Sequence, residues 1–125
     1  MIKEAYCSIE VCKLLKEKGF DEPCNHFYKF GSNELYYGST LCNSQLKGVE
    51  IYNSCTHQMA MAWLREKGLF IEICCDDLDY NWQVLDVLNR DENADPIAKS
   101  ESYGGYKQYE EAVEAALKYS LENLI

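Results

Sequence analysis

The chain carries the same helix-ending pattern twice. Lys16-Glu17-Lys18-Gly19 recurs as Arg65-Glu66-Lys67-Gly68, 49 residues later. Each copy ends a segment that opens with Cys followed by Ser or Thr, and Ser and Thr are residue types that cap helix N-termini. A glycine just past the last turn ends a helix because it adopts the left-handed conformation without strain. The pattern predicts two similar helices, one capped by Ser8 and one capped by Thr56 or Ser54.

Each predicted helix is followed by a predicted hairpin. Residues 26–37, HFYKFGSNELYY, contain two aromatic runs around a Gly-Ser-Asn turn. Residues 69–75, LFIEICC, alternate in character as a strand does, and residues 82–89 supply the return strand. The period predicts a duplicated α-β-β unit, with residues 7–54 and 55–105 as its two copies.

The remaining segments complete the predicted architecture. Residues 106–125 read as a closing amphipathic helix with acidic residues in its first turn. Residues 38–54 have no sustained period and are assigned mostly to loop. Residues 90–105 are polar, contain a proline and a Gly-Gly pair, and are assigned to a mobile loop. The predicted fold class is α+β, a single domain of residues 1–125. Its two hairpins are expected to form one mainly antiparallel sheet with the helices on one face.

The second helix places Met59, Ala60 and Trp63 on one stripe. Trp63 is the largest of these side chains. We therefore expect Trp63 to anchor this helix to the sheet.

Composition limits the classes of partner. The formal net charge is -9, which argues against nucleic acid and anionic membrane surfaces, because both attract clustered Lys and Arg. No stretch approaches the roughly 18 apolar residues of a transmembrane helix. The opening MIKEAYCSIE lacks the apolar run of a signal peptide, so a cytoplasmic protein is expected.

The same segments resemble a known family. EAYCSIEVCKLLKEKGFDEPC, THQMAMAWLREKGLFIEI and YKQYEEAVEAALKYSLENLI are similar to the three blocks of a family of small proteins without an assigned activity. Members are carried by gut anaerobic bacteria and by their phages and other mobile elements. The chain departs from the family pattern at Cys55 and Gln108, next to or at the helix starts. The resemblance implies a cytoplasmic, mobile-element-associated protein and no catalytic residue or cofactor.

The seven cysteines can be interpreted in two ways. Without a secretory signal, the expected state is reduced cysteine that packs as a small hydrophobic residue, with no metal and no cofactor. The alternative is a zinc site, because Cys24 and His26, and again Cys55 and His57, form Cys-x-His pairs that contain the chain's only histidines. Such a set needs all four side chains to converge on one point.

No pattern indicates catalysis. Cys74 and Cys75 are adjacent on a predicted strand, so their side chains point to opposite faces. Residues 76–81, DDLDYN, fail the calcium-loop motif because Trp82 replaces the required glycine. No phosphate-binding loop, dinucleotide fingerprint or nucleophile elbow occurs, and we expect the protein not to be an enzyme.

The favoured function is therefore a non-catalytic, acidic protein-interaction module with an unknown protein partner. A second copy of the chain, in a homodimer, is one candidate partner. The alternative is a metal or small-ligand binding protein that uses its Cys and His residues. The expected contact surface is the sheet face that the helices leave uncovered, with the loop of residues 90–105. Its interface candidates are Phe70, Cys74, Trp82 and Val84.

Overall fold

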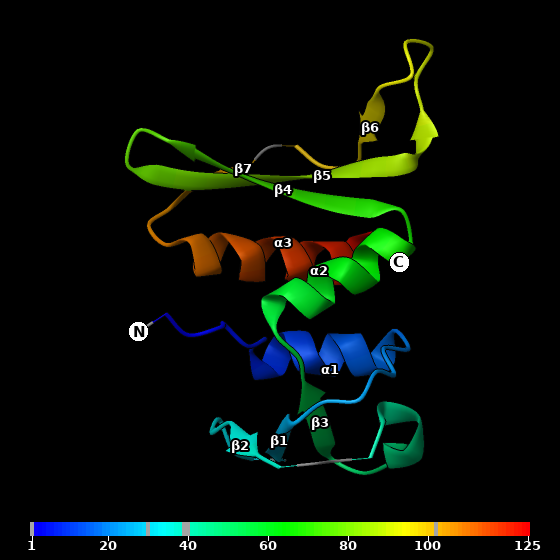
Figure 1. Cartoon of the computed structure of the whole chain (residues 1–125), viewed down its shortest axis with the longest axis vertical. Coiled ribbons are helices and arrows are strands. Elements are labelled where there is room, and N and C mark those ends of the chain that lie inside the picture. Colours follow the sequence, from blue (N-terminus) through cyan, green and yellow to red (C-terminus); the bar gives the residue numbers. More distant parts are fainter. Residues whose placement is uncertain (1, 30, 39–40, 102) are drawn as a thin grey trace.

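Three helices lie between two antiparallel sheets in the computed structural model, which describes residues 2–29, 31–38, 41–101 and 103–125 (Figure 1). The elements in chain order are α1 (Ile9–Glu17), β1 (His26–Lys29), β2 (Tyr36–Tyr37), the 3₁₀ turn η1 (Asn43–Leu46), β3 (Ile51–Ser54), α2 (His57–Glu66), β4 (Leu69–Asp76), β5 (Asp79–Arg90), β6 (Pro96–Ala98), β7 (Tyr103–Tyr106) and α3 (Tyr109–Asn123). One sheet has the strand order β2-β1-β3. The other has the order β4-β5-β6, with β7 also paired to β5.

The predicted α+β class is confirmed, but the prediction of one sheet is wrong. Residues 51–54, assigned to loop from the sequence, form β3 and pair with β1 from His26↔Ser54 to Lys29↔Ile51. Strand β2 takes the other edge of β1. With β2 on one edge of β1 and β3 on the other, the first sheet is complete at three strands, and the second hairpin belongs to a separate sheet on the other side of the helices (Figure 1).

The segment predicted as a mobile loop also contains strands. Within residues 90–105, β6 and the start of β7 both pair with β5. Ala98 lies opposite Leu85, and Tyr103 lies opposite Trp82. The polar composition of this segment hid short strands that extend one sheet.

Both predicted helix starts and stops are confirmed. Ser8 Oγ accepts a hydrogen bond from the amide three residues ahead at 3.3 Å, and Thr56 Oγ1 does the same at 3.2 Å. Gly19 and Gly68 follow α1 and α2 with φ of 96° and 88°, the left-handed conformation that ends a helix.

The proposed duplication stays a prediction. Each of α1 and α2 is followed by a hairpin, as the repeat requires. The hairpins differ, however, because β1 and β2 share two residue pairs whereas β4 and β5 share eight. The third strand also differs, since β3 pairs with the first strand of its hairpin and β6 with the second.

The core lies where the helices meet each other and the two sheets. Its buried side chains form one cluster, which includes Val11, Leu15, Phe20, Tyr28, Leu64, Ile71, Trp82, Val84, Val113, Leu117 and Leu121. This cluster spans the helix layer and reaches both sheets. The helices and both sheets therefore share a single core.

Trp63 does not anchor α2 to the sheet as predicted. It is half-buried and packs edge-on against Phe20, with ring centroids 5.7 Å apart, while the Lys67 ammonium lies 4.4 Å from its ring centroid. Of the predicted stripe, Ala60 is buried, as expected, whereas Met59 is exposed. Leu64 completes the buried face of α2 in place of Trp63.

The two helix-ending glycines provide a matched test of the fold. Alanine at either position should cost about 1 kcal/mol, because a residue with a Cβ is strained at these positive φ angles. A Cβ at Gly68 would also lie 2.6 Å from Leu88 Cδ1, whereas a Cβ at Gly19 meets no atom within 4 Å. Gly68→Ala should therefore lower the free energy of unfolding in urea by more than Gly19→Ala. Equal losses would contradict this packing of β5 over the end of α2.

Candidate functional site

The carboxylate of Glu114 joins the three helices. From α3, its Oε1 accepts hydrogen bonds from the Ser8 backbone N–H and from His57 Nε2, both at 2.8 Å. Its Oε2 accepts from Ser8 Oγ at 2.7 Å. Ser8 caps α1 and His57 is the first residue of α2. Helix N-termini favour anions, so the charge lies where two helices stabilise it.

These contacts decide the ionisation of Glu114. Burial opposes the charged form and would raise the pKa of the carboxyl group. The hydrogen bonds from His57 and Ser8 together outweigh burial, and the pKa of Glu114 lies below its ordinary range. Since both oxygens act only as acceptors, the carboxylate is the form that satisfies this network.

Cys7 completes a group that resembles a catalytic or metal-binding set. The ligand atoms of Cys7, His57 and Glu114 all lie within 4.8 Å of one another. However, the carboxylate oxygens already hold Ser8 and His57. The hydrogen bond with Cys55 and then burial raise the pKa of the Cys7 thiol, whereas a nucleophile needs a thiolate. The arrangement is better suited to holding the helices than to nucleophilic chemistry.

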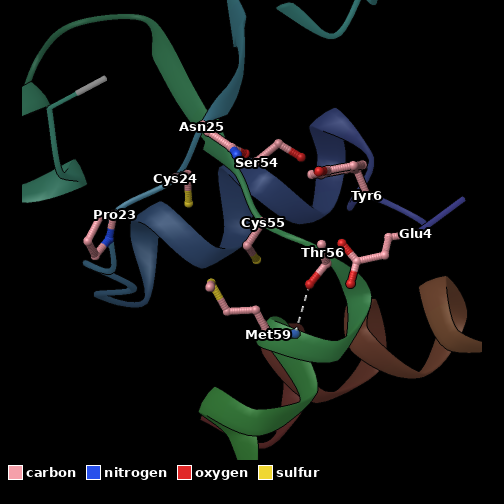
Figure 2. A pocket seen from close by; sticks show the side chains of 9 residues that line it. All are labelled: Glu4, Tyr6, Pro23, Cys24, Asn25, Ser54, Cys55, Thr56 and Met59. Atoms are coloured by element: carbon pink, nitrogen blue, oxygen red, sulfur yellow. Dashed lines mark hydrogen bonds between the residues drawn. The ribbon is translucent and has the colours of Figure 1, made fainter. Parts of the chain in front are cut away.

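A pocket of about 380 Å³ opens on the other side of Cys55. It lies between the N-terminal segment, the loop before β1 and the start of α2 (Figure 2). Figure 2 shows the sulfur-bearing side chains of Cys24, Cys55 and Met59 turned toward the same space. Cys24 is half-buried, and burial raises its pKa to about 12. The sulfur atoms facing the pocket are therefore two thiols, of which Cys24 has a raised pKa, and a thioether.

The four predicted zinc ligands do not converge. The structure brings Cys24 and Cys55 to one pocket but takes both histidines elsewhere. His26 bonds to Asn25 Oδ1 at 2.8 Å and packs at a tilt against Tyr6, with ring centroids 4.2 Å apart. His57 points to Glu114. Cys55 and His57 flank a helix start, where alternate residues do not share a face as they do on a strand.

Cys55 instead faces Cys7. The two residues lie opposite each other beside an antiparallel bridge between Tyr6 and Thr56, and the Cys7 N–H donates to the Cys55 carbonyl at 3.0 Å. Their Sγ atoms are 3.9 Å apart. Both thiols are buried and all seven cysteines are free.

Two of the four interface candidates belong to the core. Trp82 is 3% exposed and Val84 is fully buried, because β4 and β5 pair Ile73 with Trp82 and Ile71 with Val84. From the sequence, both residues were expected on the same uncovered sheet face as Phe70 and Cys74. In the structure, Phe70 and Cys74 lie on the outer face of the sheet and are exposed.

The same sheet has an open edge at β4. Strand β4 is eight residues long and ends the sheet, with β5 as its only partner strand among the described residues. The Val87 N–H donates to the Gly68 carbonyl at 2.9 Å, which sets the alternation of the ladder. The backbone groups of Leu69, Ile71, Ile73 and Cys75 therefore point away from β5, toward solvent.

No family model, no curated protein and no solved structure matches this chain. Among the residues described, no helix has the length and apolar character needed to span a bilayer.

Glu114→Gln tests the helix junction. The amide cannot carry the charge that His57 and Ser8 stabilise, so the free energy of unfolding at neutral pH should fall by about 1–3 kcal/mol. Because the pKa of Glu114 is depressed in the fold, its contribution exists above its unfolded pKa and is lost as pH falls through the folded value. The difference between the two proteins in urea unfolding should therefore narrow in acid.

Glu110→Gln is the matched control, since Glu110 is exposed in the first turn of the same helix. It should change stability by less than about 0.5 kcal/mol. The assigned role of the carboxylate would be contradicted if Glu114→Gln lowered the free energy of unfolding no more than Glu110→Gln does. It would also be contradicted if the effect of Glu114→Gln stayed the same in acid.

Proposed function

We propose that this protein is a non-catalytic interaction module that receives an extended, basic segment of another protein along β4. The observation that carries the proposal is the open edge of this strand. Edge strands offer unpaired N–H and C=O groups that a further strand can bind. Protein partners are recognised in this way by β-strand addition.

The hydrogen-bonding capacity of the edge is sufficient for a short peptide. Leu69, Ile71, Ile73 and Cys75 each present one N–H and one C=O outward. Most natural edges are shortened, bulged or covered, which discourages pairing. Strand β4 has a continuous register with β5 from Leu69↔Asp86 to Asp76↔Asp79, so its edge is regular over its full length.

The charge around β4 indicates the chemistry of the partner. Glu72 and Asp76 lie on the outer face of β4, and Asp77 follows in the turn. The whole chain has a formal net charge of -9. Lys or Arg side chains on the added strand would meet these carboxylates across the strand pair. Next to the side chain that meets Glu72, an apolar side chain on the same face of the added strand would contact Phe70, which is 39% exposed.

The same charge disfavours a homodimer formed at this edge. Self-pairing would bring two chains of net charge -9 together, and like charges repel. The negative potential of the chain attracts a basic segment and repels a second copy. Self-pairing is therefore the outcome against which the proposal is tested.

A non-catalytic role agrees with the chemistry of the polar groups. The carboxylate of Glu114 is engaged by Ser8 and His57, and the Cys7 and Cys24 thiols have raised pKa values. The cytoplasmic, mobile-element setting implied by the family resemblance would supply the partner. Neither nucleic acid nor a membrane is proposed as a ligand, because both favour a basic surface.

Cys75→Pro tests the edge directly. The N–H of Cys75 points outward, so proline removes a donor from the free edge and leaves the β4–β5 ladder intact. The probe is a synthetic ten-residue peptide that alternates Lys and Val. Its binding should shift the amide NMR signals of Ile71 and Ile73 and weaken with added salt. Proline should lower the affinity by about tenfold or more, which corresponds to about 1.4 kcal/mol.

Cys75→Ala is the control, because it removes the thiol and keeps the N–H. It should bind the peptide as the original chain does, and both variants should melt alike. Equal binding by Cys75→Pro, or equal binding of a peptide with Glu in place of Lys, would refute the proposal. A dimer in sedimentation that Cys75→Pro dissolves would identify a second copy as the occupant.

A further inference from the structure

Cys7 and Cys55 form a pair of thiols that the interaction module proposed above does not use. Their Sγ atoms are 3.9 Å apart, and both side chains are buried. Cys7 precedes Ser8, the cap of α1, and Cys55 precedes Thr56, the cap of α2. The pair therefore lies where the starts of two helices meet.

The backbone holds the two cysteines at a separation that a disulfide can span. They lie opposite each other beside the antiparallel bridge of Tyr6 with Thr56, and the Cys7 N–H donates to the Cys55 carbonyl at 3.0 Å. Opposed residues of antiparallel strands have Cα atoms about 4.5–5.5 Å apart. Disulfides join Cα atoms about 4.4–6.8 Å apart, with the sulfur atoms about 2.0 Å from each other. Rotation of the two side chains is therefore enough to bring the sulfur atoms into bonding distance.

Two neighbouring thiols are placed differently. Cys12 Sγ donates to the Cys7 carbonyl at 3.5 Å, and Cys24 Sγ donates to the Glu22 carbonyl at 3.5 Å. These thiols bond to backbone oxygen atoms, whereas Cys7 and Cys55 contact each other through sulfur. The geometry therefore favours a bond within the Cys7–Cys55 pair.

The pocket gives access to Cys55 and not to Cys7. Cys55 lines the pocket of about 380 Å³, whereas Cys7 is not among its described lining residues. Figure 2 shows the Cys55 side chain turned toward this space. Cys7 is fully buried. A small molecule in the pocket therefore meets the Cys55 sulfur first, and Cys7 can be reached only through Cys55.

The pocket also indicates the charge of such a molecule. Among the described residues that line it, Glu4 is the only charged one. The whole chain has a formal net charge of -9. This negative potential attracts small cations and repels small anions.

We infer that Cys55 is a site of thiol–disulfide exchange with a small cationic disulfide, and that Cys7 completes a Cys7–Cys55 disulfide. First, the Cys55 thiol loses its proton and its sulfur attacks one sulfur of the reagent. The reagent S–S bond breaks, and one half leaves and takes up a proton as a thiol. Cys7 then loses its proton and attacks the Cys55 sulfur, which breaks the mixed disulfide and releases the second half as a thiol. Two protein thiols are oxidised, and the reagent disulfide is reduced to two thiols.

The surroundings of Cys7 support this order of steps. The hydrogen bond with Cys55 is the largest cause of the raised pKa of Cys7, followed by burial. Because the thiolate is the attacking form, Cys7 is unreactive while Cys55 remains a thiol. Once Cys55 carries half of the reagent, that thiol is gone and the largest cause of the raised pKa is removed. Cys7 therefore becomes more reactive after Cys55 has reacted. The inference is independent of strand addition at β4.

The test is exposure of the folded full chain to cystamine, a small cationic disulfide, without oxygen. Cys74 and Cys75 are exposed and are first replaced by Cys74→Ser and Cys75→Ser, which leave five of the seven thiols. After alkylation in denaturant, mass mapping should show the loss of two thiols and a bond between Cys7 and Cys55. Dithiodiglycolate, an anionic disulfide of similar size, should form the same bond at least about tenfold more slowly.

Cys24→Ser is the matched control, because it removes the other thiol of the pocket and keeps the pair. It should form the Cys7–Cys55 bond as fast as its parent chain. Cys7→Ala should instead retain half of the cystamine on Cys55 as a mixed disulfide. The parent chain in urea keeps the test decisive if Cys7→Ala does not fold. Unfolded, it should give a mixture of disulfide pairings, whereas the folded chain should give one.

Several outcomes would overturn the inference. One is a bond between Cys24 and Cys55, or mixed disulfides on the folded parent chain without the Cys7–Cys55 bond. Another is the same mixture of pairings in the folded and unfolded chains, or no reaction of the folded chain at a cystamine concentration that oxidises the unfolded one. Equal rates with cystamine and dithiodiglycolate would overturn the assignment of a cationic reagent.

Discussion

The ionised carboxylate of Glu114 holds the middle layer of the structure together. It binds the cap of α1 and the first residue of α2 from a position on α3, so one side chain determines how three helices meet. Because one sheet packs on α1 and the other on α2 and α3, the same contact links the two sheets (Figure 1). A buried charge is costly unless hydrogen bonds compensate it, and here Ser8 and His57 supply them. The fold thus depends on a polar contact at the point where the three helices meet.

Local signals predicted the helices well because their ends are determined locally. Ser8, Thr56, Gly19 and Gly68 act within one turn of their own positions, and a cap or a left-handed glycine needs no distant partner. The sheets depended on pairings between remote segments. Residues 51–54 have no strand pattern of their own, yet they pair with β1 along its whole length. That pairing split the predicted single sheet into two.

The site shows the same division between local and distant information. The sequence selected Cys24, His26, Cys55 and His57 from their spacing. The structure places Cys24 and Cys55 at one pocket, His57 at Glu114 and His26 beside Tyr6. Cys7 and Glu114 were not identified, since they are far apart in sequence and Glu114 resembles the acidic residues beside it on α3. One signal was present: Glu114 precedes Leu117 and Leu121 by three and seven residues, which places it on a buried stripe. A carboxylate on such a stripe needs partners, and its partners were the capped starts of the other helices.

The open edge of β4 and the pocket beside β3 therefore lie on opposite sides of a helix layer that Glu114 organises. The central claim is that this carboxylate is ionised and held by hydrogen bonds. Carbon-detected NMR of the Glu114 side chain during a pH titration tests it most directly. If the hydrogen bonds hold the carboxylate, its pKa lies below the value of about 4.3 for an unperturbed glutamate. A pKa at or above that value would show that burial prevails over the hydrogen bonds and would contradict the account.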